Sequence, residues 1–271
     1  MKMGIQMWSI HDECMRRGVD ETMRIVSDMG YTGFEFAVHE YATVEQLWGE
    51  RPEKIAETMA RYGVQPLGIH LNWDLFSADP MTVIRECRIL GLPYLGLGHL
   101  YYPDREPAER QMAIHKRLGE LSRIAADNGM KMLLHVSATG YCRDYKGRYS
   151  FEGMLEDVGE EWIQPEFDTA WMVVGGVDPE AYIRKYAGRV DVLHLKEFTG
   201  PLEQTEDVMK RHDAITIDRA CAIGASGSQN TPGIIETARE SGTKWILTEL
   251  WNEENALENA LQSARYIRPL L

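Results

Sequence analysis

The sequence predicts an α/β protein of the (β/α)8 barrel class, and three observations lead to this prediction. Short apolar runs alternate with longer amphipathic segments, the alternation repeats eight times, and the repeats fill a chain of 271 residues. Such alternation implies parallel strands joined by right-handed crossovers, with helices covering the sheet. A closed barrel of this kind needs roughly 250 residues. An open doubly wound sheet is the weaker interpretation, because no GxGxxG turn follows the first apolar run.

The first half of the chain repeats one scheme four times: an apolar run of strand length, then an amphipathic segment that stops before a glycine. Glycine is favoured directly after a helix C-terminus, and Pro107 stands where a first helical turn tolerates proline. The expected strands are 4–8, 33–36, 65–71 and 94–98. The expected helices are 19–29, 44–62, 81–90 and 107–128.

The second half follows the same scheme less regularly. Its irregular stretches, 141–149 and 198–229, are long for a compact domain, and loops of that length are usually functional lids or disordered. The expected strands are 131–136, 163–168, 190–194 and 245–249. The expected helices are 151–158, 179–186, 233–240 and 256–267.

Composition limits the partners and the compartment. Lysine plus arginine number 29 and aspartate plus glutamate 42, a formal net charge of −13, which disfavours nucleic acid because its binding needs a basic face. No window approaches the ~20 apolar residues that span a bilayer, and the start lacks the apolar core of a signal peptide. We therefore expect one cytoplasmic domain, 1–271, with no membrane partner. The four scattered cysteines indicate neither a disulfide framework nor a zinc–thiolate site.

Polar side chains stand at the ends of the expected strands. Active sites of such barrels form where the strands end, whereas valine, isoleucine and leucine normally fill the interior. One such residue could be a solvated or satisfied group, but the whole set predicts a functional rim. The set comprises Trp8, Glu35, His70, His99, His135, Asp168, His194 and Glu249, with Lys196 two residues after His194.

Four members of this set predict a metal site. His135, Asp168, His194 and Glu249 would supply two imidazoles and two carboxylates from the last four strands. This mixed shell suits one divalent ion, Mn²⁺, Zn²⁺, Co²⁺ or Fe²⁺, with Mg²⁺ a further candidate. Ligands on separate strands have no fixed sequence interval, so the predicted barrel is what gathers them.

Several motifs are distinctive. The segment 175–197, GGVDPEAYIRKYAGRVDVLHLKE, is the most specific, and FDTAW, GIQMWS, GYTGFEF, GIH and WILTELWNE accompany it. Together they resemble the xylose isomerase-like TIM-barrel superfamily, the sugar phosphate isomerase/epimerase group, over nearly the whole chain. The resemblance implies a divalent metal at the barrel mouth and a small-molecule sugar, cyclitol or keto-sugar as substrate. Carried over by position, it implies Asp168, His194 and Glu249 as ligands.

The fifth-strand ligand departs from the pattern of the family. Its epimerases have a glutamate there, whereas counting from Gly129 without gaps places His135 at that position. Related members with a histidine there carry a glutamate five residues later, where this chain has Gly140. His135 is therefore either the fourth ligand or a base beside a three-ligand metal. An imidazole, with an ordinary pKa near ~6.5, can do acid or base work at neutral pH.

Five further residues have a functional and a structural interpretation. Lys196 is expected on the substrate side of the metal, where an ammonium can bind a developing oxyanion, or else in solvent at the rim. Glu35 and His70 resemble family positions that bind sugar hydroxyls. Trp8 and Trp171 could offer flat faces to a sugar ring or belong to the core.

The loop 141–149 and the function itself leave alternatives open. Arg143, Lys146 and Arg148 could receive an anionic substrate group, although a solvated loop is the simpler interpretation.

The leading function is an isomerase or epimerase that works through an enediolate, with Glu249 and His135 as the acid–base pair. A carbon–oxygen lyase, either a dehydratase or a 3-keto-glycoside-cleaving enzyme, needs only one base and a Lewis acid. A non-catalytic carbohydrate-binding accessory subunit is the third hypothesis, and a homo-oligomer is also open. The nuclease branch of the superfamily, resembling endonuclease IV, fits poorly because it needs more metal ligands and the charge of −13 opposes DNA.

Overall fold

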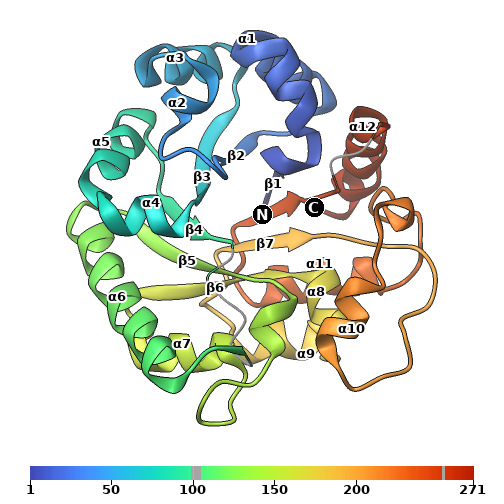
Figure 1. The fold of residues 1–271 in the computed structure, drawn as a ribbon. Coiled ribbons are helices and arrows are strands. Elements are labelled where there is room, and N and C mark those ends of the chain that lie inside the picture. The colour runs from blue at the N-terminus through green and yellow to red at the C-terminus, as the bar shows by residue number, and fades with distance from the viewer. Residues whose placement is uncertain (99, 101–104, 252–253) are drawn as a thin grey trace.

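The strands form a closed parallel barrel in the computed structural model, which describes residues 1–98, 100, 105–251 and 254–271. They pair in chain order, and β8 closes the barrel against β1. Figure 1 shows the barrel surrounded by its helices, so the predicted (β/α)8 fold is confirmed. The strands are β1 Lys2–Gln6, β2 Gly33–Ala37, β3 Gln65–Leu71, β4 Tyr94–Leu97, β5 Lys131–Val136, β6 Ile163–Asp168, β7 Val192–Leu195 and β8 Trp245–Thr248.

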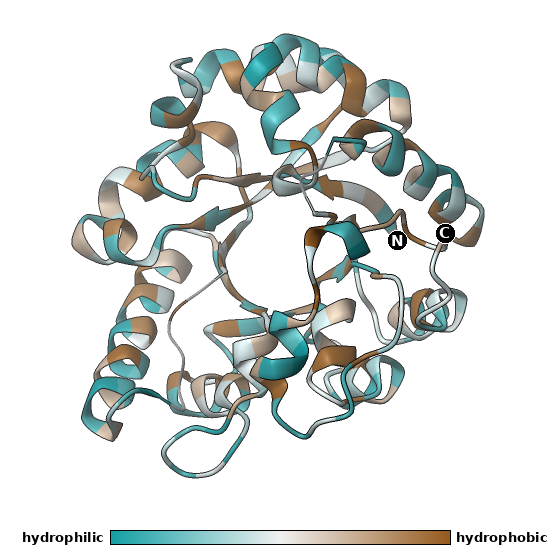
Figure 2. Ribbon diagram, turned by 45° about the vertical axis from the view of Figure 1, so that its right-hand side comes forward, coloured by the Kyte–Doolittle hydropathy of each residue, from teal (hydrophilic) through white to brown (hydrophobic). Residues whose placement is uncertain are grey.

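The helices turn one apolar stripe toward the barrel. In Figure 2 the helical ring carries both hydrophilic and hydrophobic residues, as amphipathic helices do. None of the helices in the described ranges is long and apolar enough to cross a membrane. They are α1 His11–Met29, α2 Val44–Trp48, α3 Pro52–Tyr62, α4 Trp73–Ala78, α5 Pro80–Leu90, α6 Ala108–Asp127, α7 Ser150–Val158, α8 Thr169–Val174, α9 Pro179–Lys185, α10 Val208–Asp213, α11 Thr231–Glu240 and α12 Ala256–Ile267.

The structure differs from three local predictions about helices. The expected helix over 44–62 is two helices, because Gly49 adopts a left-handed conformation with φ +69° and Pro52 starts α3. The helix predicted over 19–29 is present, but a further helical segment that begins at His11 precedes it in α1, separated by a kink at Gly18, and was not predicted. The stretch 198–229 contains α10 and a 3₁₀ turn at Ile217–Arg219, so it is only partly irregular.

Several strands also differ at their ends, and the differences in β1 and β8 affect residues of the expected rim. β1 ends at Gln6, and Trp8 lies in a 3₁₀ turn, Met7–Ile10, that follows the strand. β8 ends at Thr248, so Glu249 is the first residue beyond it. His99, expected at the end of the fourth strand, lies outside the described residues.

The barrel interior is apolar at the N-terminal end of the strands and polar at the other end. Successive inward side chains on a strand are two residues apart. His135, His194 and Glu249 therefore follow a buried apolar layer by two positions on their strands. That layer, which closes the floor of the barrel, consists of Leu67, Tyr94, Leu133, Val192, Trp245 and Leu247.

Candidate metal centre and active site

The four predicted metal ligands meet at the C-terminal ends of β5–β8. His135 Nε2 lies 3.4 Å from Glu249 Oε2 and 3.9 Å from Asp168 Oδ2, and His194 Nδ1 lies 2.5 Å from Glu249 Oε2. One donor atom from each residue lies within 4.8 Å of the other three. All four side chains are buried. We call His135, Asp168, His194 and Glu249 the upper cluster.

The donors of the upper cluster fit a divalent metal ion. Both ring nitrogens of His135 and Asp168 Oδ2 are buried and have no hydrogen-bond partner among the described residues. Each buried polar atom left in that state costs about 1–3 kcal/mol. A cation held between these groups would satisfy the oxygen and one of the imidazole nitrogens. Two imidazoles and two carboxylates form a mixed shell that suits Zn²⁺, Mn²⁺, Co²⁺ or Fe²⁺.

Burial and neighbouring charges set the protonation of these groups. Burial lowers the pKa of His135 to about 4 and raises the pKa of Asp168 to about 7. Burial also opposes ionisation of Glu249, but the Lys196 ammonium and the imidazoles of His135 and His194 hold its pKa well below the usual range. At neutral pH His135 is thus a neutral imidazole and Glu249 a carboxylate, the forms that bind metals or accept protons.

Lys196 is buried beside the upper cluster. Its Nζ lies 2.6 Å from Glu249 Oε1 and 3.9 Å from Asp168 Oδ2. The same ammonium lies 4.6 Å from the ring centroid of Trp251 and 5.3 Å from that of Trp171. Cation–π attraction and the ion pair therefore hold this positive charge in place. The solvated rim position that we considered for Lys196 is excluded.

A cavity of about 650 Å³ opens at the barrel mouth, a size typical of small-molecule sites. His135 and Glu249 reach this cavity together with Lys196, whereas Asp168 and His194 are fully buried. Four indoles from four different segments also line it, and apolar C–H edges of a sugar ring pack well on such faces. They belong to Trp8, Trp73, Trp171 and Trp251.

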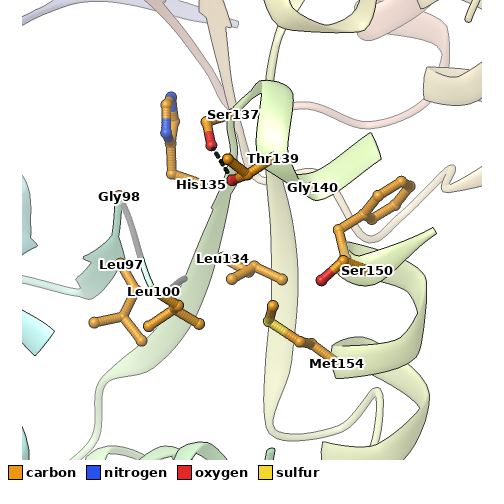
Figure 3. Close-up of a pocket in the computed structure, with 11 residues that line it drawn as sticks. Leu97, Gly98, Leu100, Leu134, His135, Ser137, Thr139, Gly140, Ser150 and Met154 are labelled. Atoms are coloured by element: carbon orange, nitrogen blue, oxygen red, sulfur yellow. Dashed lines mark hydrogen bonds between the residues drawn. The ribbon is translucent and has the colours of Figure 1, made fainter. Parts of the chain in front are cut away.

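A much smaller cavity, about 20 Å³, lies on the other side of His135. It has room for about one water molecule. Figure 3 shows that Leu134 points from β5 toward Met154, while the neighbouring His135 points to the opposite side. This alternation along β5 is what directs the His135 ring toward the upper cluster.

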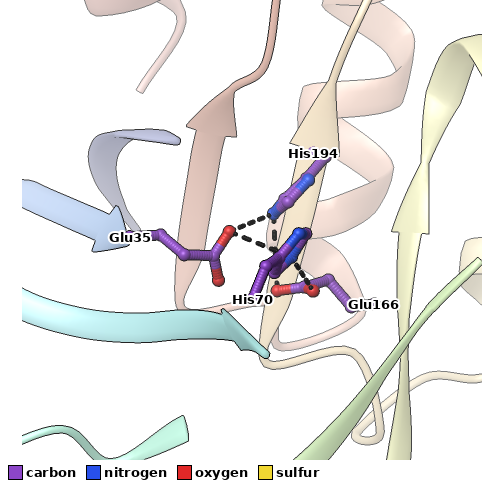
Figure 4. A group of neighbouring side chains, drawn as sticks. All are labelled: Glu35, His70, Glu166 and His194. Carbon is purple, nitrogen blue, oxygen red and sulfur yellow. Dashed lines mark hydrogen bonds and ion pairs between the residues drawn. The ribbon is translucent and has the colours of Figure 1, made fainter. Parts of the chain in front are cut away.

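A second group of titratable side chains lies deeper in the barrel. Glu35, His70 and Glu166 converge with His194 from β2, β3, β6 and β7 (Figure 4), and one donor atom of each lies within 4.8 Å of the others. We call these four residues the lower cluster. His194 belongs to both clusters: its Nε2 lies 3.0 Å from Glu35 Oε2 and 3.4 Å from Glu166 Oε1, whereas its Nδ1 faces Glu249.

Our sequence interpretation missed Glu166, although two signals could have found it. Glu166 precedes Asp168 by two residues and therefore shares its inward face. The second signal is glycine inside neighbouring strands, which marks a close approach of other groups. A Cβ on Gly96 would lie 3.3 Å from Glu166 Oε2 and 2.7 Å from His70 Cδ2.

The expected rim position of Glu35 was wrong. β2 continues to Ala37, so Glu35 lies two residues before the strand end and is fully buried. His70 does line the mouth cavity, and its Nε2 also lies 2.9 Å from Glu166 Oε2. Substrate contact by His70, Trp8 and Trp171 stays a prediction.

Two of the three cations of the loop 141–149 pair with acidic side chains. Arg148 pairs with Asp144 and Asp157 at 2.7 Å and 3.1 Å, and Lys146 pairs with Asp157 at 3.2 Å. Arg143 stacks over the ring of Tyr149. These contacts favour a structural role for the loop over recognition of an anionic substrate.

Comparison with known proteins agrees with this geometry. The family model described as xylose isomerase-like TIM barrel matches residues 23–270. The inosose dehydratase of Clostridium beijerinckii is 26% identical over 159 residues, which cover 56% of this chain and 51% of that protein. The inosose dehydratase of Clostridium botulinum is 25% identical over 162 residues, with coverages of 56% and 51%. The matched region thus spans about half the length of these curated relatives.

Solved structures share the fold at lower identity. A sugar phosphate isomerase/epimerase from Parabacteroides distasonis has a TM-score of 0.78 and 18% identity, covering 99% of this chain and 98% of its own. The IOLI protein with a binding zinc atom has a TM-score of 0.76 and 15% identity, with coverages of 99% and 96%. A D-psicose 3-epimerase in the presence of D-fructose has a TM-score of 0.69 and 15% identity, with coverages of 100% and 99%.

Proposed function

Because the chain belongs to the xylose isomerase-like TIM barrel family, we propose that it is a divalent-metal-dependent isomerase or epimerase of a sugar or keto-sugar. It transfers a proton at the carbon next to the substrate carbonyl. The observation that carries the proposal is the convergence of His135, Glu249 and Lys196 on one cavity, where the first two also form a possible metal site with the buried Asp168 and His194. Solved structures with the same fold include a D-psicose 3-epimerase and an L-ribulose 3-epimerase, and these support the same class.

The residues of the site divide the chemistry between them. When bound by the upper cluster, the metal ion would act as a Lewis acid on the substrate carbonyl. Glu249, a carboxylate, and His135, a neutral imidazole, are the groups at the cavity that can take a proton from carbon and return it. The Lys196 ammonium lies next to Glu249 and can stabilise the negative charge that develops on a substrate oxygen.

A carbon–oxygen lyase is the second candidate, and two observations favour it. The curated relatives are inosose dehydratases, and β5 carries His135 where the family's epimerases have a glutamate. Elimination needs one base and an acid for the leaving oxygen, which Glu249 and Lys196 could supply. The same cavity and the same metal donors would serve this reaction.

Solvent exchange tests the proposal. The metal-loaded protein is incubated in D₂O with ketohexoses, ketopentoses and inososes, and deuterium in the recovered and rearranged sugars is measured by NMR and mass spectrometry. We expect incorporation at the carbon next to the carbonyl, abolished in Asp168→Asn and His194→Ala. Asp191→Asn is the matched control, because Asp191 is also a buried aspartate but precedes β7 and pairs with Lys131 and Lys244, away from the upper cluster.

The products separate the candidates. Rearranged or epimerised sugar supports the proposal, whereas loss of water or release of an aglycone replaces it with the lyase. A wild-type protein that binds no metal and exchanges no proton with any of these sugars contradicts both and favours the accessory subunit.

A further inference from the structure

The lower cluster shares His194 with the upper cluster, but its two carboxylates, Glu35 and Glu166, have no part in the chemistry described so far. Two carboxylates and two imidazoles within 4.8 Å of one another could hold a second metal ion or could form a hydrogen-bonded network. The position of the protons decides between these two roles.

A chain of hydrogen bonds fixes the proton on His70. The backbone N–H of Trp8 donates to Gln6 Oε1, which leaves the amide nitrogen of Gln6 facing His70 Nδ1 at 3.2 Å. Since an amide nitrogen only donates, His70 Nδ1 accepts and Nε2 carries the ring proton. This Nε2–H points at Glu166 Oε2, 2.9 Å away. His70 is therefore a donor in the lower cluster and has no electron pair there for a metal.

The same reasoning applies to His194, which the two clusters share. A neutral imidazole has one N–H and one nitrogen that accepts. If Nδ1 serves the metal with His135, Asp168 and Glu249, then Nε2 must keep its proton. Nε2 lies 3.0 Å from Glu35 Oε2, and both atoms are buried. Neither has a hydrogen-bond partner among the described residues, so a small turn of the ring or the carboxylate would be needed to align the N–H with the oxygen.

We propose that Glu35 is a positioning residue, which accepts the Nε2 proton of His194 and thereby aims Nδ1 of that ring at the metal. Metal-binding histidines commonly donate their second ring nitrogen to a carboxylate, which fixes the tautomer and makes the ligand more basic. Glu166 has the weaker claim to this role, because it lies 3.4 Å from Nε2 and already accepts from His70. Gly68 leaves the space in which the Glu35 carboxylate sits. The inference rests on the metal dependence of the proposed function.

Glu35→Gln is the variant that tests the role, because it keeps the size of the side chain and removes its charge. We expect zinc affinity, measured by competition with a chromophoric chelator, to fall by about 10–100-fold, the usual effect of removing the carboxylate that accepts from a metal-binding histidine. Glu86→Gln is the matched control, since Glu86 is also buried but caps α2 through the N–H groups of Val44 and Glu45. Its zinc affinity should equal that of the wild type.

Ring ¹⁵N NMR of histidine-labelled protein gives a readout that a loss of stability alone would not produce. In the zinc-loaded wild type, the His194 signal, assigned with His194→Gln, should show protonated Nε2 and metal-bound Nδ1. In Glu35→Gln we expect a mixture of tautomers.

Three outcomes would overturn the inference. The first is a Glu35→Gln variant with wild-type zinc affinity and a single tautomer. The second is a wild type that binds two zinc ions and loses one in this variant, which would make Glu35 a ligand. The third is a wild type that binds no zinc, Mn²⁺, Co²⁺ or Fe²⁺, which also removes the proposed function. A wild type that binds one metal and exchanges no substrate proton leaves the role of Glu35 supported and contradicts the proposed function alone.

Discussion

The buried charge of Lys196 leads to a quantitative prediction for Lys196→Met in the metal-free protein. The ion pair with Glu249 is 2.6 Å long, and the two side chains are only 4% and 7% exposed. Removing one partner of such a buried pair lowers the free energy of unfolding by about 3–5 kcal/mol, because the remaining charge is buried and poorly solvated. A chain of this length loses about 2 °C in Tm per kcal/mol, so Tm should fall by about 6–10 °C.

The assay is calorimetry with a chelator and again with saturating zinc. A divalent cation in the upper cluster would compensate the carboxylates of Glu249 and Asp168 that the lost ammonium no longer serves. We therefore expect the difference in Tm between the variant and the wild type to shrink markedly when zinc is present. Circular dichroism at 20 °C checks that the variant is folded before the scan.

Lys244→Met is the matched control for this experiment. Lys244 also forms an ion pair, 3.0 Å from Asp191, but its side chain is 60% exposed and Asp191 keeps Lys131 as a partner. Exposed pairs contribute about 0–1 kcal/mol, so the control should lose no more than about 2 °C, with or without zinc. Equal losses for the two variants in chelator would refute the reasoning, as would a loss for Lys196→Met that zinc does not reduce.

Three further predictions concern metal content, pH and thiols. Elemental analysis should find that Asp168→Ala has lost the metal. If His135→Ala also loses the metal, His135 is a ligand, and if His135→Ala retains the metal, His135 is a base. Burial lowers the pKa of His115 in the folded protein, so the unfolded chain binds more protons than the folded protein near pH 6.5. The free energy of unfolding should therefore fall from pH 7 to pH 5. His115→Gln should flatten this slope, and an unchanged slope in that variant would contradict the prediction. Maleimide should label the partly exposed Cys221 before Cys14 at pH 7.5, because burial shields Cys14 and raises its pKa to about 12. Equal labelling rates of the two cysteines, measured by mass spectrometry, would contradict this.

The fold was predictable because its signals are local. The strands at 65–71, 131–136 and 163–168 and the helix at 256–267 have the predicted bounds, since an apolar run or an amphipathic period marks each of them. Two short helices had no such signal. α4 and α8 follow β3 and β6 directly, and each begins where a side chain, Asn72 or Asp168, accepts a backbone N–H. Capping by one residue leaves no periodic pattern in the sequence.

The candidate site was predictable only in its outer layer. The upper cluster stands where strands end, which is the position that barrel geometry singles out. Glu166 lies two residues before the end of β6, so a search of strand ends alone passes over it. Glu35 was found only because its strand was expected to end near it, whereas β2 continues to Ala37. Trp73 and Trp251 come from segments after the strands, whose path depends on tertiary packing.

The spacing of two residues along each strand explains why the site is layered. Going inward from the upper cluster, β5, β7 and β8 present Leu133, Val192 and Leu247, which close the floor. β6 instead presents a second carboxylate, Glu166, and that carboxylate with Glu35 makes the polar layer beneath the metal donors. The residues that line the cavity can therefore change when the substrate changes, because its indoles come largely from segments beyond the strand ends. The upper cluster, in contrast, is held from below by residues inside the strands. A change of reaction would accordingly be expected first at His135 and the cavity wall rather than in the lower cluster.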